Sequence, residues 1–66
     1  MAVHKTIEIM AESDKSWSDA AQKVVEEASK TVNNIKSIWV KDQTASVDDG
    51  KITSYRVNCK VTFKVK

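Results

Sequence analysis

Residues 54–65 read SYRVNCKVTFKV, and their side chains alternate in character without interruption. Because successive side chains of a strand point to opposite faces, this segment is predicted to be one long strand with one apolar face. Twelve residues at about 3.3 Å each span roughly 40 Å, whereas a compact monomer of this length is only about 30 Å across. The strand is longer than its own domain, which indicates an assembly of several chains. The apolar parity consists of Tyr55, Val57, Cys59, Val61, Phe63 and Val65.

The chain has 66 residues and is expected to form a single domain over residues 1–66. A domain of this size buries too little surface to be comfortably stable alone, and disulfides, metals or oligomerisation usually compensate. A single cysteine excludes an internal disulfide, and one cysteine with one histidine excludes a zinc site of the usual kind. Self-association remains, so the expected partner is the chain itself.

Charge and hydropathy exclude two further classes of partner. The net charge of +2, with 30% charged residues, is that of an ordinary protein surface rather than of a nucleic-acid-binding one. No apolar run is long enough to span a membrane. Residues 1–10 alternate polar and apolar side chains and lack the uninterrupted apolar stretch of a signal peptide, so we expect a cytoplasmic protein.

Three more elements precede the long strand. Residues 3–10 alternate as a strand, and residues 11–15 form a polar connection. Residues 16–31 are predicted to be a helix, because apolar side chains recur at helical spacing and Ser16 with Asp19 resembles a capping box. Asn33 and Asn34 should end it, since asparagine tolerates the left-handed conformation.

Residues 35–47 are predicted to be a second strand, bent near Asp42 and Gln43, where the apolar parity becomes unclear. Asp48, Asp49 and Gly50 then form a hairpin turn, for which Asp-Gly is a strong signal. The order is strand, helix, strand, strand. We therefore expect an α+β fold in which a three-stranded antiparallel sheet curls around one helix and leaves its other face for neighbours or solvent.

Four segments along the chain together resemble the dodecin family. They are KTIEI (residues 5–9), SDKSW (13–17) leading to Ala20 and Ala21, TVNNI (31–35), and residues 52–64 with YRV and VTFK. The resemblance covers essentially the whole chain. It implies a β-α-β-β subunit, twelve of which assemble into a hollow shell that binds and buffers a small molecule.

The resemblance also implies flavin, as FMN or riboflavin, for the ligand. In flavin-binding dodecins a tryptophan early in the second strand stacks on the flavin ring, and a glutamine in the third strand hydrogen-bonds its edge. Those places fall here on Ser37, which cannot stack, and on Arg56, which donates hydrogen bonds but cannot accept them. The alternative is a structural or Ca²⁺- or Mg²⁺-binding dodecin relative that holds no flavin and possesses no organic cofactor.

Trp39 follows Ser37 on the same strand face, about 7 Å away. It is either a relocated stacking platform or an aromatic anchor in a subunit interface. Arg56 belongs to a cationic row with Lys60 and Lys64. This row either binds an anionic group or pairs with carboxylates such as Glu8 and Glu12.

Asp42, Asp48 and Asp49 are possible oxygen ligands for a divalent ion, although aspartates in turns are common for backbone reasons. Their spacing does not match an EF-hand, so the metal ligands are left unassigned. His4 and Cys59 stand alone and form no nucleophilic constellation. We expect a binding protein and not an enzyme.

Overall fold

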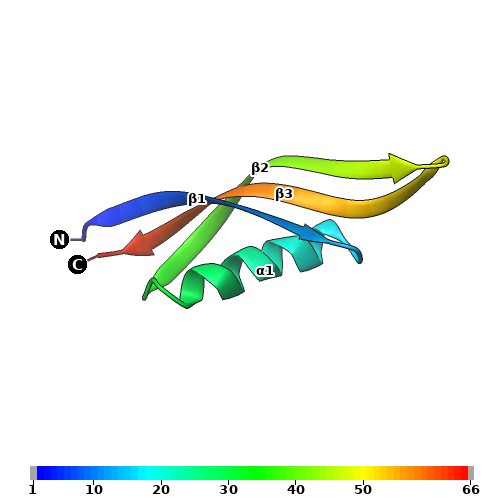
Figure 1. Ribbon diagram of the computed structural model, residues 1–66. Helices are drawn as coiled ribbons and strands as arrows, with labels where there is room; N and C mark the ends of the chain where they lie inside the picture. Colours follow the sequence, from blue (N-terminus) through cyan, green and yellow to red (C-terminus); the bar gives the residue numbers. More distant parts are fainter. Residues whose placement is uncertain (1, 66) are drawn as a thin grey trace.

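The computed structural model describes residues 2–65 and contains one helix and three strands (Figure 1). The chain order is β1 (His4–Ser13), α1 (Trp17–Ser29), β2 (Ile35–Asp48) and β3 (Lys51–Lys64). The strands form one antiparallel sheet in the order β1-β3-β2, and α1 lies along one face of it. The predicted α+β fold with β-α-β-β order is confirmed. The molecule measures 52 × 19 × 13 Å, so the long strand does set its shape.

The core lies between α1 and the apolar side of β3. Ala20, Val24 and Ala28 from the helix meet Val57, Cys59 and Val61, and all six are almost completely buried. Three-residue and four-residue steps place the helical members on one stripe, and two-residue steps place the strand members on one face. The predicted apolar parity of β3 is therefore confirmed at its centre. It fails at Val65, which follows the end of the strand and is 48% exposed.

The helix begins where the sequence predicts and ends earlier. Ser16 is the N-cap, and its Oγ accepts a hydrogen bond from the backbone N–H of Asp19 at 2.9 Å. The predicted end at residue 31 is wrong by two residues. The backbone N–H groups of Lys30 and Thr31 bond to the carbonyls three residues earlier, which tightens the last turn and closes the helix at Ser29.

Asn34 does adopt the left-handed conformation, with φ of 62°, but it does so at the entrance to β2 rather than at the helix end. Its carbonyl accepts a hydrogen bond from the backbone N–H of Lys64 at 3.0 Å, so the turn is fastened to the end of β3. The predicted left-handed conformation of Asn34 is therefore confirmed, but the prediction that this residue ends the helix was wrong.

β1 runs three residues further than predicted. Ala11 pairs with Val57 and Ser13 with Tyr55, so the segment taken for a connection continues the sheet. Ala11 and Ser13 are small, and Ser13 is polar, so the inward parity carries little hydrophobic signal there. The Ser13 hydroxyl can be buried without loss of hydrogen bonding. It donates to the Asp19 carboxylate at 2.6 Å and accepts from the backbone N–H of Lys15 at 2.9 Å.

Trp17 joins the start of α1 to the sheet. Its indole N–H donates to the carbonyl of Thr44 in β2 at 2.9 Å, and its ring meets that of Tyr55 edge to face at 4.9 Å between centroids. The ring packs against the edge of the apolar core. This one side chain therefore contacts both strands of the hairpin.

β2 has three register shifts against β3, one of them between Val40 and Asp42. The extra residue there is Lys41, which forms a β-bulge and reverses the side-chain parity that follows. This is the bend predicted near Asp42 and Gln43, displaced by one or two residues. Ile38 and Val40 face the core before the bulge, and Ala45 is half-buried after it.

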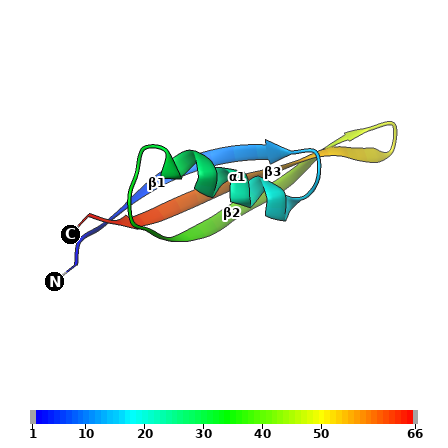
Figure 2. The same cartoon turned by 90° about the horizontal axis from the view of Figure 1, so that it is seen from below.

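The predicted hairpin turn is confirmed at Asp49 and Gly50, whose φ angles are 52° and 74°. Two central residues with positive φ are the mark of a two-residue type I′ turn. Because β1 ends opposite Tyr55, residues 46–54 form a two-stranded ribbon, hereafter the hairpin tip. Figure 2 shows this tip extending beyond α1.

Candidate functional site

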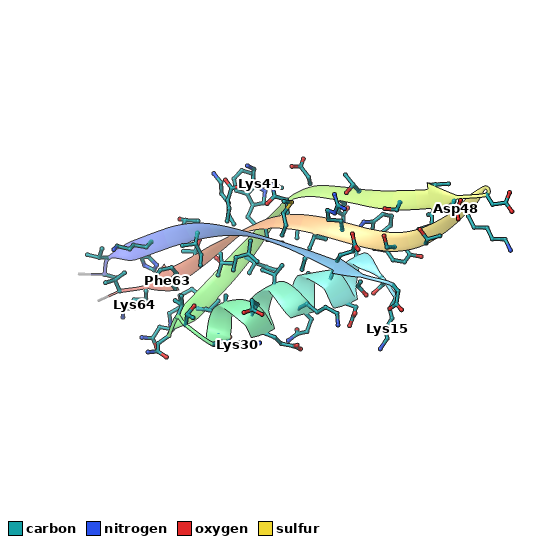
Figure 3. The ribbon with its side chains drawn as sticks, viewed as in Figure 1. Lys15, Lys30, Lys41, Asp48, Phe63 and Lys64 are labelled. Carbon is teal, nitrogen blue, oxygen red and sulfur yellow. The ribbon has the colours of Figure 1, made fainter. Side chains whose placement is uncertain are left out.

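The face of the sheet opposite α1 carries the candidate site residues. Residues paired across strands point to the same side, so the partners of the polar parity of β3 define this surface, which we call the bare face. In Figure 3, Lys41 projects from this side, away from α1. The bare face consists of Thr6, Glu8, Met10 and Glu12 from β1, Ser37, Trp39, Asp42 and Thr44 from β2, and Arg56, Asn58, Lys60 and Thr62 from β3.

Two ion pairs cross the bare face. Arg56 Nη2 lies 3.1 Å from Glu12 Oε1, and Lys41 Nζ lies 3.4 Å from Glu8 Oε1. The pairing of Arg56 with Glu12 is one of those expected from the sequence. These side chains are between one third and about one half exposed, so solvent screens each pair and its contribution to stability is small, on the order of 0–1 kcal/mol. Their effect is to occupy the two carboxylates of β1.

Trp39 and Met10 are the exposed large apolar side chains of the bare face, with 63% and 65% of their surfaces exposed, and Trp39 is the one with an aromatic ring. It pairs with Lys60, whose Nζ lies 5.4 Å from the centroid of the indole ring. That is within the range of a cation–π interaction. The ring therefore has an ammonium group against one of its faces.

The three predicted cofactor-binding residues share this face but do not form one cluster. Ser37 pairs with Thr62, Trp39 with Lys60, and Arg56 with Thr44. Six residues of β3 separate the level of Ser37 from that of Arg56, which is roughly 20 Å. Within one chain, Ser37 and Trp39 can serve the same ligand, and Arg56 belongs to a different part of the surface.

Two features of the bare face were missed from the sequence. Thr6 and Thr62 lie level with Ser37, so three small hydroxyl side chains form one row across the sheet. The bulge at Lys41 also brings Asp42 and Thr44 to this face, whereas an unbroken alternation from Trp39 would place them on the core side. The unclear parity near Asp42 was the available signal for it.

The possible metal ligands are also dispersed. Asp42 lies on the bare face level with Asn58, whereas Asp48 and Asp49 lie at the hairpin tip (Figure 3). Within residues 2–65, no three histidine, cysteine or acidic side chains gather as a metal site would require. Ca²⁺ takes six to eight oxygen ligands, so one described chain does not supply a cation site by itself.

Cys59 lies in the core, and burial raises the pKa of its thiol. Both effects suppress its reactivity. In the described part of the chain, no helix is long and apolar enough to cross a membrane.

Comparison with known proteins gives consistent matches. A family model described as Dodecin matches residues 3–66. The calcium dodecin of Mycobacterium tuberculosis is 40% identical over 67 residues, which cover 100% of this chain and 93% of that protein. Its crystal structure, described as a calcium-chelating immunodominant antigen with a novel calcium-binding site, has a TM-score of 0.81 at 38% identity and covers 97% of this chain and 91% of that one.

Two further solved structures show the same fold at lower identity. A variant of the Thermus thermophilus dodecin has a TM-score of 0.92 at 23% identity, covering 100% of this chain and 98% of that one. The dodecin of Streptomyces davaonensis has a TM-score of 0.90 at 23% identity, covering 98% and 96%. At this identity the likeness concerns the arrangement of the strands and the helix.

Proposed function

Because the chain belongs to the dodecin family of small binding proteins, we propose that it forms a homo-oligomer that binds a divalent cation. The observation that carries this is the 40% identity, over the full chain, with a protein named calcium dodecin. The residue at the expected flavin-stacking place supports it, because Ser37 offers no ring.

Self-assembly is supported by the surfaces that the subunit leaves exposed. Val47 and Ile52 pair at the hairpin tip and are 66% and 50% exposed, on a ribbon that neither β1 nor α1 covers. A two-stranded ribbon is marginally stable in water by itself. Contacts with a neighbouring copy would bury this apolar pair and the free edges of the sheet.

Sedimentation velocity tests the assembly. A shell of twelve subunits sediments with about twelve times the mass of the 7.4 kDa chain. Replacing Val47 with lysine should shift the distribution toward smaller species. Lys51→Gln, at an exposed position of the same ribbon, serves as the surface control and should leave the distribution unchanged. A wild-type protein that sediments at 7.4 kDa at micromolar concentration would refute the proposal.

Cation binding is proposed to use carboxylates from several copies. The two carboxylates of β1 are held by Lys41 and Arg56, which leaves Asp42 and the two aspartates of the hairpin turn as the better candidates. A symmetry axis of the oligomer would bring the same aspartate from several subunits together around one cation. Such a site binds fewer ions than there are subunits, and this separates it from a site contained within one chain.

Equilibrium dialysis against ⁴⁵Ca²⁺ measures that stoichiometry. We expect fewer than one ion per subunit, and loss of binding in either Asp42→Asn or Asp49→Asn. Asp49→Asn keeps a residue that tolerates positive φ, so the turn itself is preserved. Asp14→Asn, at an exposed position in the β1–α1 connection, is the control. Binding of one ion per subunit, unchanged in both test variants, would contradict a shared site.

Flavin binding is the second candidate, favoured by the exposed ring of Trp39 beside Ser37. Here the relocated tryptophan would stack on FMN or riboflavin. Titrating the protein into riboflavin tests it, since stacking on tryptophan quenches flavin fluorescence. Full fluorescence at tens of micromolar protein would exclude this candidate.

We further propose that the protein acts by binding and not by catalysis, and that nucleic acid and membranes are not its partners. Its one thiol is buried and its net charge is only +2. A free thiol is also compatible with the reducing cytoplasm, which is the proposed location. Fractionation of cells that express the protein at native levels tests that location.

A further inference from the structure

We infer that Trp39 and Lys60 together form a binding site for a planar aromatic molecule that carries a negative charge. This rests on the ring-binding candidate of the proposed function and adds to it the class of ligand and the residue that selects it. Neither residue occupies the places at which the resemblance locates the stacking tryptophan or the glutamine.

The indole of Trp39 provides the surface for stacking. The side chain stands on the bare face, away from α1, with 63% of its surface exposed. Its neighbours on the Ser37 side are small, since the adjacent level of the sheet holds Ser37, Thr62 and Thr6. Next to the indole there is therefore a low, hydroxyl-lined surface on which a flat molecule can lie without displacing a large side chain.

Lys60 supplies the charge. Its ammonium lies 5.4 Å from the ring centroid, and among residues 2–65 no carboxylate oxygen lies within ion-pairing distance of it. Glu8 of β1 is the register partner of Lys60 in β3, but the Glu8 carboxylate is paired with the ammonium of Lys41 at 3.4 Å. An anionic group on a ring stacked against Trp39 would form an ion pair with Lys60, which no carboxylate of residues 2–65 does.

Asp42 is the opposing charge that must be considered. It lies on the same face, level with Asn58, and is therefore one level away from the Trp39–Lys60 pair, or about 7 Å. Its carboxylate repels an anionic ligand, less strongly than the adjacent ammonium attracts it, because the separation is larger and the surface is solvated. Neutralising Asp42 should thus strengthen binding, which is the opposite of what neutralising Lys60 does.

Two probes with one ring system separate stacking from charge: 2-naphthoate and its neutral analogue 2-naphthalenemethanol. Their binding to the intact oligomer is measured by equilibrium dialysis at low ionic strength, alongside the riboflavin titration. We expect 2-naphthoate to bind about fivefold more tightly, as for an exposed ion pair of about 1 kcal/mol. Lys60→Gln should remove that preference, and Asp42→Asn should increase it about twofold. Lys64→Gln, which removes the same charge four residues further along the same face, should leave it unchanged.

Trp39→Leu should weaken both probes by about fivefold to 150-fold, because aromatic stacking contributes about 1–3 kcal/mol. Equal affinity of the two probes would overturn the role of Lys60 and leave ring binding standing. If neither probe binds while riboflavin is quenched, the assignment to Trp39 and Lys60 is wrong and the ring-binding candidate survives. If riboflavin is also unquenched, both fail. Dissociation of the oligomer in Trp39→Leu would overturn the inference in favour of a subunit interface.

Discussion

Val24→Ala is the substitution that most directly tests how the helix is held on the sheet. Val24 is completely buried between Val57, Cys59 and Val61. Removing two methyl groups at about 0.8 kcal/mol each loses about 1.6 kcal/mol, and the residual cavity adds about 1 kcal/mol. Alanine recovers roughly 0.5 kcal/mol through its higher helix propensity. The net expected loss of stability is about 2 kcal/mol.

Val25→Ala is the matched control. It makes the same chemical change one residue along the same helix, where the side chain is only half-buried, and it gains the same helix propensity. Its expected cost is below about 0.5 kcal/mol. Both variants and the parent protein are unfolded in urea and followed by circular dichroism, at one fixed subunit concentration because association contributes to the apparent stability.

For a chain of this size a slope near 1 kcal/mol per molar urea is appropriate, so Val24→Ala should lower the midpoint by roughly 2 M. Equal midpoints for the two variants would refute the packing described for α1. A reduced slope in Val24→Ala alone would instead indicate a change in the compactness of the unfolded or the native state, or a loss of two-state unfolding, and thermal unfolding of the same samples would then be compared.

Four other outcomes are expected. Ser16→Ala should cost about 1 kcal/mol through the lost N-cap, with Ser16→Asp close to the parent in the same urea assay. Gly50→Ala should cost roughly 1–2 kcal/mol from backbone strain alone, since no atom lies within 4 Å of the added methyl group, and Gly50→Asn should cost less. The hydrogen bond from Ser13 lowers the pKa of the Asp19 carboxyl group in the folded protein. The ionised carboxylate therefore stabilises the fold fully above the pKa that Asp19 has in the unfolded chain, and this stabilisation is lost as the pH falls through the lower folded-state pKa. Asp19→Asn should flatten the decrease in stability below about pH 4, and an unchanged decrease would contradict this role of Asp19. Native Cys59 should resist Ellman's reagent at pH 8 and react fully in urea, because burial raises the pKa of its thiol.

The sequence predicted the elements whose side chains carry a strong period. Val57, Cys59 and Val61 alternate in hydrophobicity, and Val24 and Ala28 repeat at helical spacing, so both faces of the core could be identified. The type I′ turn followed from Asp-Gly because few sequences tolerate two successive positive φ angles.

The end of β1 could not be predicted in the same way. Ser13 is buried through hydrogen bonds with Asp19 and Lys15, and these contacts exist only once the strand and the helix are in place. The bulge at Lys41 had a weak signal in the sequence. Its consequence is that Asp42 and Thr44 share the face of Trp39. The pairing of Lys41 with Glu8 across the central strand depends on the register of all three strands.

The candidate site was identified as a set of residues but not as an arrangement. Ser37 and Arg56 were chosen through the resemblance to dodecins, and parity placed Trp39 on the same strand face as Ser37. Their separation along the sheet became visible only with the pairing to β3. The contact of Lys60 with the indole was not predicted, because a cross-strand pair requires knowledge of the register.

The strand order also has a consequence for how the protein is made. β1 and β2 each pair only with β3, which is synthesised after both of them. Lys64 is the register partner of His4, so the first strand of the sheet meets its last residues only after most of the chain has been translated. A ribosome adds about 5–20 residues per second, and β1 and α1 therefore wait for seconds with their apolar sides uncovered. The sheet of this subunit therefore forms only after β3 has been synthesised, and the nascent chain needs protection over that interval because its last strand lies in the middle of the sheet.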